Sequence, residues 1–143
     1  MTSFAPFISA TKKAGLLASL LLLIGCTSCS KKVTFLNSSV VPAARGEVSV
    51  KTDRNNNYVV NLELTYLAEP ERLSPPKKTY VVWLVSDKSE IPLNLGQVVG
   101  TSHLNIKFSA VSSSKPKRIF ITAEDDASTQ TPSSVVVLET NNF

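Results

Sequence analysis

The sequence predicts an all-β protein, specifically an immunoglobulin-like antiparallel β-sandwich of about seven strands. From Gly46 onward, apolar and polar residues alternate with period two, which is typical of half-buried strands. Clusters of Pro, Asn, Ser and Gly separate these runs, and no helical period occurs after the N-terminal leader. A chain of 143 residues has room for one such domain, which we expect to span residues 46–143.

The expected strands follow one another with clear turn signals between them. In "YVVNLELTYL" (58–67), Val60, Leu62 and Leu64 face one way while Asn61 and Glu63 face the other. The asparagines before this run favour a turn, and the three prolines after it, in "AEPERLSPPKK", exclude a central strand. The expected strand ranges are 47–53, 58–67, 79–87, 91–100, 103–110, 118–124 and 134–140.

The same alternation assigns residues close to strand ends to the buried face. Tyr66 continues the inward face of the run at 58–67. In "HLNIKFSA" (103–110), Leu104, Ile106 and Phe108 are all expected to point inward.

The strand "TYVVWLVSD" (79–87) is apolar on both faces, which a two-layer sandwich does not require. We expect one face, Val81, Trp83 and Val85, to be core, because a Trp in the third strand suits an immunoglobulin-like core. The other face, Tyr80, Val82 and Leu84, then needs a cover. Either an apolar stretch of the preceding chain docks there or a partner protein does, and we predict a binding face at these three residues.

Residues 1–25 have the three parts of a secretory signal peptide. Lys12 and Lys13 supply the positive charge, Gly15 to Gly25 form an apolar run of eleven residues, and small residues follow. Net charge falls from +4 for the whole chain to +2 when these two lysines leave with the leader. With no dense basic cluster, that charge argues against nucleic acid as a partner.

The leader ends in Leu23-Ile24-Gly25-Cys26, which resembles a bacterial lipobox. The resemblance implies cleavage before Cys26 and a diacylglyceryl group on its sulfur, with the membrane as the partner of that lipid. The alternative is an uncleaved membrane helix over the seventeen uncharged residues 14–30, but its polar end makes the apolar part too short to span. Cys29 is either a spacer residue, a second acylation site or an intermolecular disulfide partner.

Residues 26–45 are expected to form a lipidated tether that lifts the domain clear of the lipid headgroups. Lys, Asn, Ser, Pro and Ala dominate the stretch "SKKVTFLNSSVVPAAR". Val33, Phe35, Leu36, Val40 and Val41 are too apolar for a pure linker, so part of the stretch is a candidate strand docked on the domain.

Side chains with catalytic or ligand chemistry are sparse. His103 is the single histidine, and nothing in the sequence places a nucleophile and a carboxylate beside it. Glu124, Asp125 and Asp126 form an acidic cluster that could offer oxygen ligands to calcium, although its spacing matches no standard loop and a solvated turn is favoured. We therefore expect no enzyme, no cofactor and no metal site. The basic stretches at 77–78 and 115–118 could contact lipid headgroups or an acidic glycan, and a role as solubilising loops is favoured.

Three segments of the mature chain resemble the C-terminal extracytoplasmic domain of anti-sigma-K factors. They are "TYVVWLVSD", "IPLNLGQV" and "RIFITAEDDASTQTPSSVVVLET", which occur in the same order in that family. The resemblance implies the sandwich fold and a location outside the cytoplasm. The sigma-binding region and membrane span of those factors are not part of the matching segments, so inhibition of a sigma factor is not implied.

These observations favour a non-catalytic protein that is lipid-anchored to a bacterial membrane in the cell envelope and acts as a binding or structural module, with an envelope protein as a possible partner. The alternative is a periplasmic accessory to an anti-sigma or envelope-stress signalling system. A small hydrolase ranks last, because no catalytic set is present in the sequence.

Overall fold

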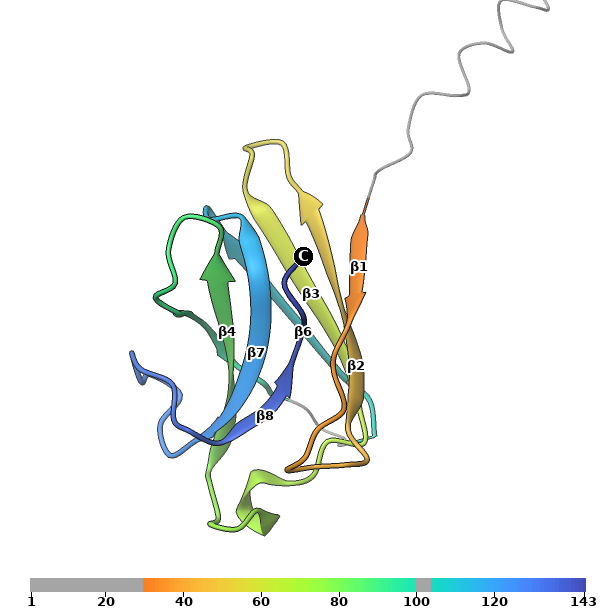
Figure 1. The fold of residues 1–143 in the computed structure, drawn as a ribbon, viewed down its shortest axis with the longest axis vertical. Helices are drawn as coiled ribbons and strands as arrows, with labels where there is room; N and C mark the ends of the chain where they lie inside the picture. Colours follow the sequence, from red (N-terminus) through yellow and green to blue (C-terminus); the bar gives the residue numbers. More distant parts are fainter. Residues whose placement is uncertain (1–29, 100–103) are drawn as a thin grey trace, which may run out of the picture.

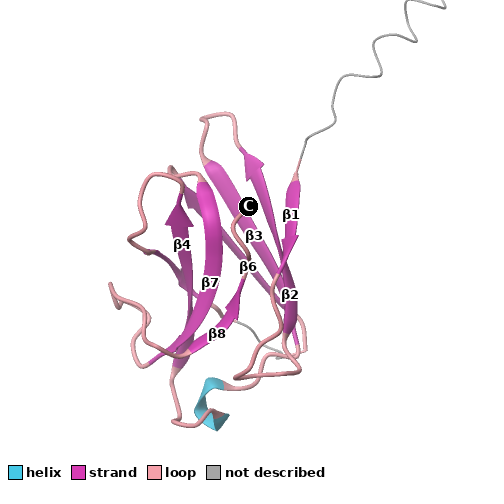
Figure 2. Ribbon diagram, in the orientation of Figure 1, coloured by secondary structure: helices cyan, strands magenta, loops and turns pink. Residues whose placement is uncertain are grey.

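A computed structural model describes residues 30–99 and 104–143 of the chain and confirms the predicted all-β sandwich. Two four-stranded antiparallel sheets lie face to face (Figure 1). Among the described residues, the only helix is one 3₁₀ turn, Pro70–Arg72, at one end of the sandwich (Figure 2). It lies in the proline-rich stretch that the sequence excluded from the sheets.

Eight strands are present in the described part of the chain, one more than the sequence predicted. The first sheet has the order β1-β2-β3-β6, and the second has the order β5-β4-β7-β8. The bounds are β1 Lys31–Thr34, β2 Arg45–Thr52, β3 Tyr58–Thr65, β4 Thr79–Ser86, β5 Leu93–Gln97, β6 Ile106–Ser112, β7 Pro116–Glu124 and β8 Val136–Glu139.

The strand order is that of an immunoglobulin-like sandwich. Strands β2 to β8 take the places of strands A, B, C, C′, E, F and G, and β1 extends the first sheet beyond β2. The chain crosses between the sheets after β3, after β5 and after β6, so consecutive hairpins are interrupted by Greek-key connections.

Period-two alternation decides which side of the first sheet is buried. In the register of β2 with β3, Val48 lies opposite Leu62 and Val50 opposite Val60, so apolar side chains meet on the inner face. The outer face of this sheet carries polar pairs instead. Lys32 bonds Glu47 at 2.7 Å, Lys107 approaches Glu63 at 3.4 Å, and Ser109 donates to Asn61 at 2.8 Å.

The ends of the strands depart from the alternation. Ile106 is buried and Phe108 packs partly against the core, but Leu104 is 66% exposed because β6 begins only at Ile106. Tyr66 is 60% exposed because the chain turns there through a positive φ of 55°, which ends β3 and rotates the side chain away from the core.

The turn between β2 and β3 is built around Asp53. Its Oδ1 accepts backbone N–H groups of Asn57 at 2.9 Å and Asn55 at 2.7 Å, and Asn56 adopts a positive φ of 62°. The backbone hydrogen bond from Asn57 is the main cause that lowers the pKa of the Asp53 carboxyl below its usual value.

Residues 31–45 belong to the sandwich, so the tether expected for residues 26–45 is wrong over most of its length. β1 pairs with β2 from Lys31 opposite Val50 to Thr34 opposite Glu47. The docking of part of this stretch as a strand, which its apolar residues suggested, is confirmed.

After β1 the chain bridges the two sheets. Phe35 donates its N–H to Gly46 O at 3.0 Å, and Leu36 donates to Glu139 O at 2.8 Å. Phe35 and Val41 are buried in the main core. Residue 46 must be glycine for β2 and β3 to lie this close together, because a Cβ there would lie 2.6 Å from Leu64 Cδ2 and 2.7 Å from the Glu63 carbonyl oxygen.

The contribution of this segment to stability is testable at two adjacent positions. Phe35 is 8% exposed and Leu36 is 42% exposed. We expect Phe35→Ala to lower the free energy of unfolding by about 3–5 kcal/mol and Leu36→Ala to lower it by less than about 1 kcal/mol. Urea unfolding followed by Trp fluorescence measures both, and equal small losses would show that the segment does not pack on the domain.

Candidate functional site

The three residues that the sequence predicted as a binding face lie inside the main core. Tyr80, Val82 and Leu84 are 4%, 0% and 1% exposed and share one cluster with residues of the first sheet. Phe35, from the bridging segment after β1, belongs to the same cluster. The first sheet and this segment therefore cover that face of β4. Because these side chains are buried, they offer no exposed surface to a partner protein, and the prediction of a protein-binding face at these three residues is wrong.

The opposite face of β4 is also buried, but it points away from the first sheet. Val81, Trp83 and Val85 form a separate small cluster with Phe120 of β7. The rings of Trp83 and Phe120 are 6.3 Å apart at an interplanar angle of 15°. The prediction that these side chains are core residues is confirmed by their burial. Their expected position between the sheets, as for the Trp of an immunoglobulin domain, is wrong.

The connection between β7 and β8, residues 125–135, covers this outer cluster. Asn94 of β5, which lies opposite Trp83 in the sheet, donates from Nδ2 to Ala127 O at 3.0 Å and to Thr129 O at 2.7 Å. Ser133 Oγ donates to Ala123 O at 2.9 Å. The connection is thus hydrogen-bonded to β5 on one side of β4 and to β7 on the other. It acts as the third layer that a strand with two apolar faces needs.

A chain of buried polar groups runs beneath this connection. Trp83 Nε1 donates to Thr122 Oγ1 at 2.7 Å, and Thr122 in turn donates to Glu124 Oε1. The same Glu124 oxygen accepts the backbone N–H of Ser133 at 2.7 Å. No buried side-chain polar atom of the described residues lacks a partner. These groups therefore hold the connection in place, and none of them is left unbonded for chemistry.

The acidic cluster at Glu124, Asp125 and Asp126 is divided among three separate interactions. Glu124 is 5% exposed and belongs to the buried chain, while Asp125 forms an ion pair with Lys77 at 2.7 Å. Asp126 Oδ1 accepts the backbone N–H and the hydroxyl of Ser128, both at 2.8 Å, and the backbone hydrogen bond is the main cause that lowers its pKa. Within the described ranges, no three His, Cys, Asp or Glu residues are grouped so that they could hold a metal ion.

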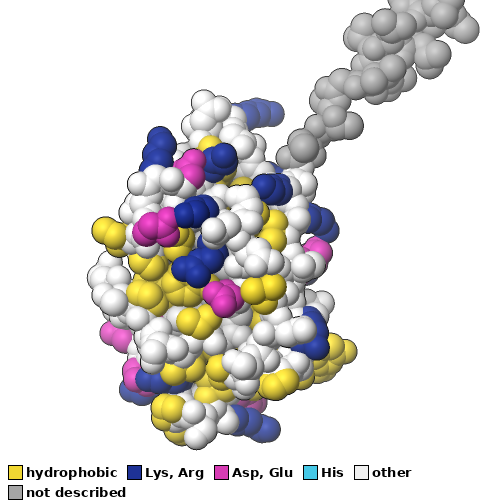
Figure 3. All heavy atoms as spheres, in the orientation of Figure 1, with side chains coloured by type: hydrophobic (Ala, Val, Ile, Leu, Met, Phe, Trp, Pro, Cys, Tyr) yellow, Lys and Arg dark blue, Asp and Glu magenta, His cyan; other side chains and the backbone are white. Residues whose placement is uncertain are grey.

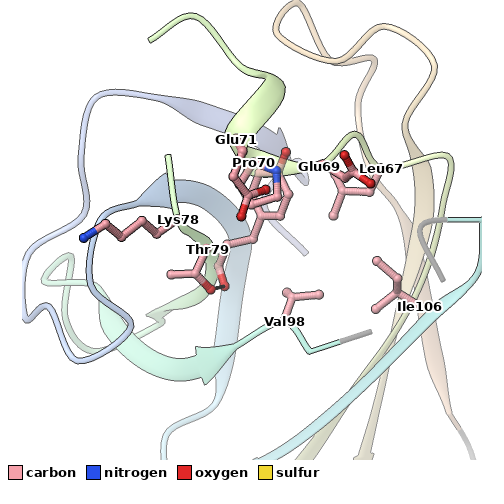
Figure 4. A pocket seen from close by; sticks show the side chains of 9 residues that line it. Leu67, Glu69, Pro70, Glu71, Lys78, Thr79, Val98 and Ile106 are labelled. Carbon is pink, nitrogen blue, oxygen red and sulfur yellow. Dashed lines mark hydrogen bonds between the residues drawn. The ribbon is translucent and has the colours of Figure 1, made fainter. Parts of the chain in front are cut away.

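A hollow of about 500 Å³ opens at the end of the sandwich that carries the 3₁₀ turn (Figure 4). Glu71 supplies a carboxylate on one side of it, beside Glu69, which is paired with Arg72 at 2.7 Å. Val98 and Ile106 supply apolar walls on the other side, while the ammonium group of Lys78 points away. Its remaining lining residues are Leu67, Pro70, Thr79 and Tyr80. The hollow could hold a small ligand with an apolar part and a positive group.

Tyr80 is the one residue of the predicted binding face that lines this hollow. Its hydroxyl donates to Ala68 O at 2.9 Å. Burial, with a smaller contribution from the negative charge of Glu71, raises the pKa of Tyr80 to about 12. The phenol therefore stays neutral at physiological pH and fixes the chain that leads into the 3₁₀ turn.

Other residues singled out in the sequence have plain structural surroundings or lie outside the description. Cys26, Cys29 and His103 fall outside the described residues. In the basic stretch 115–118, Lys117 pairs with Glu90, and Arg118 lies 3.4 Å from Glu139 and 5.2 Å over the ring of Phe120. Among the described residues, no helix is long and apolar enough to cross a membrane.

Comparison with protein-family models, with curated proteins and with solved structures finds no match for this chain. The fold is therefore assigned from the strand order alone, and the resemblance to anti-sigma-K factors stays a prediction.

Sequence reasoning missed the outer cluster and the hollow. The outer cluster had a signal, because both β4 and the run "RIFITA" of β7 are apolar on both faces. No sequence signal marks Glu69 and Glu71 as neighbours of Val98 and Ile106, since crossings between the sheets bring these segments together.

Burial of both faces of β4 predicts the effect of substitutions there. Val82→Asp places an unpaired charge in the core and should abolish cooperative unfolding, and Trp83→Ala should cost about 3–5 kcal/mol. Val111→Asp, at a 60% exposed position of β6, should leave the fold standing. Circular dichroism spectra and thermal melts of the three variants measure these effects. A well-folded Val82→Asp variant would show that the face of β4 that carries Val82 is open to solvent.

The raised pKa of Tyr80 makes stability fall at high pH. The unfolded chain ionises the phenol near pH 10 and the folded chain only near pH 12, so the stabilisation is complete below pH 10 and is lost as pH rises through about 12. We expect the free energy of unfolding to fall between pH 10 and pH 12 by about 1–2 kcal/mol less in Tyr80→Phe than in the wild-type protein. Tyr66→Phe, at an exposed site, should keep the wild-type slope, and equal slopes for all three proteins would contradict the assignment.

Proposed function

We propose that this chain is a non-catalytic, lipid-anchored protein of a bacterial cell envelope, whose β-sandwich acts as a binding or structural module outside the cytoplasm. The observation that carries this is the distance along the chain between the lipobox and the fold. Cys26 precedes the first residue of β1, Lys31, by only five positions, so the sandwich begins directly after the residue that would carry the lipid.

The remaining support comes from the interactions of the polar and acidic side chains in the described domain and from its hollow. Its polar buried groups are bonded to one another, and its acidic cluster serves three structural interactions. The hollow beside Tyr80 offers carboxylates and apolar walls for binding. A role as a periplasmic accessory to a signalling system rests on the resemblance to anti-sigma-K factors alone, and no feature of the described residues favours it.

The lipid anchor is tested by comparing the two cysteines. The wild-type chain and Cys29→Ser should both incorporate a clickable fatty acid and give an intact mass that starts at residue 26 with added lipid. Cys26→Ser should incorporate none, because the thiolate that accepts the diacylglyceryl group is gone. Cysteine-specific labelling followed by mass spectrometry of the membrane fraction reads out all three.

One outcome would favour the uncleaved helix instead. If Cys26→Ser remained in the membrane fraction with the mobility of the wild-type protein, residues 14–30 would be the anchor and the lipobox would be without function.

A further inference from the structure

We propose that the end of the sandwich at which β1 begins docks on an anionic membrane surface. This inference rests on the proposed lipid at Cys26 and deepens it, because it names the face that the anchored domain presents to the lipid headgroups.

The chain between the lipid and the fold is too short to hold the domain away from the membrane. Lys31 follows Cys26 by five positions, and a fully extended chain over those five steps spans at most about 18 Å. The sequence had suggested a tether of about twenty residues. Since residues 31–45 belong to the sandwich, the end of the sandwich where β1 begins is the end nearest the bilayer.

Antiparallel pairing places three connections at that same end. Lys31 lies opposite Val50 near the top of β2, and Tyr58 at the start of β3 lies opposite Ser112 at the end of β6. Ser86 at the end of β4 lies opposite Pro116 at the start of β7. The β2–β3 turn, the β4–β5 connection and the β6–β7 connection therefore lie at the same end of the sandwich as the start of β1 (Figure 1). We call residues 31–32, 51–58, 86–92 and 112–118 the entry end.

Positive charge is concentrated at the entry end. It carries eight Lys and Arg (Lys31, Lys32, Lys51, Arg54, Lys88, Lys115, Lys117 and Arg118) against three Asp and Glu (Asp53, Asp87 and Glu90). The other described residues carry five Lys and Arg against eight Asp and Glu. In Figure 3 most of the visible blue side chains lie in the half of the molecule that the chain enters, and a few lie towards the opposite end. The entry end therefore carries a net positive charge, and the rest of the described domain carries a net negative charge.

Most of this positive charge is not neutralised within the domain. Lys51, Arg54, Lys88 and Lys115 are exposed and form no ion pair with any described residue. Of the acidic side chains at this end, Asp53 accepts backbone N–H groups of its own turn and Glu90 pairs with Lys117. Lysine and arginine near an anionic bilayer surface attract it over about a Debye length.

An apolar side chain projects from the same end. Ile91, in the β4–β5 connection, is 80% exposed, and Leu93 beside it is 48% exposed. Lys88, which is also exposed, precedes Ile91 by three residues, so the β4–β5 connection carries both a positive and an apolar side chain. This combination is typical of segments that enter the interface between headgroups and acyl chains, and a soluble polyanion would not require the apolar tip.

The docking is tested with a Trp reporter in the full lipidated protein on vesicles. Ile91→Trp should lose fluorescence when the vesicles contain brominated acyl chains and about a quarter phosphatidylglycerol. Tyr66→Trp, which places the reporter at the exposed opposite end, should be unaffected, as should the wild-type protein with its buried Trp83. On vesicles of phosphatidylcholine alone, quenching of Ile91→Trp should be weak.

Charge dependence is tested with two triple variants of equal net charge. Arg54→Glu with Lys88→Glu and Lys115→Glu should lower the ratio of docked to undocked domains at least about tenfold in the Ile91→Trp background. The matched control, Arg72→Glu with Lys78→Glu and Lys107→Glu, changes the charge equally away from the entry end and should leave quenching unchanged. Salt near 1 M should act like the first variant.

Vesicle flotation separates failure of this inference from failure of the lipid anchor. All variants that retain Cys26 should float with the vesicles whatever their docking, and a protein that does not float overturns the proposed anchor. Equal quenching of Ile91→Trp and Tyr66→Trp in a protein that floats overturns the docking. Equal effects of the two triple variants, or equal quenching on both lipid mixtures, overturn the assignment to an anionic surface.

Discussion

Strand β4 is buried on both of its faces, and most of the domain is arranged to meet that constraint. A strand whose side chains are apolar on both sides needs a cover on each. The first sheet covers Tyr80, Val82 and Leu84, and this contact forms the main core. The β7–β8 connection covers the side that carries Trp83. Loss of either cover would expose a contiguous apolar surface at the centre of the second sheet.

The outer cover depends on a small number of polar contacts, because a connection without strands buries little apolar area by itself. Trp83, Thr122 and Glu124 are linked in sequence, and Glu124 ends the chain by accepting the N–H of Ser133. Buried polar groups cost free energy unless they are bonded, so each group fixes the position of the next. The conformation of the connection and the rotamer of Trp83 are therefore coupled through these hydrogen bonds.

The segment after β1 has a second consequence beyond packing. By entering the core through Phe35 and bridging to β8 through Leu36, it makes the N-terminal stretch part of the rigid domain. With the proposed lipid on Cys26, this packing would hold the domain close to the bilayer and restrict its orientation. Under that proposal the charge at the near end can act on the bilayer, whereas on a long flexible tether the domain could face in any direction.

The sequence by itself determined seven of the eight described strands, the β2–β3 turn and the inner face of the first sheet, because these depend on period-two alternation and on local turn chemistry. Val60, Leu62 and Leu64 are buried as the alternation requires, and Asp53 and Asn56 form the turn that the asparagines indicated. Local pattern also marked β4 as apolar on both faces. It could not say which face met the other sheet, since both faces have the same polarity and the choice depends on contacts between distant segments. Only the tertiary structure decided that Trp83 points outward under the β7–β8 connection, that Phe35 enters the core beside Gly46, and that Glu69 and Val98 line one hollow. Each of these follows from crossings between the sheets, and those crossings are set by packing over the whole domain.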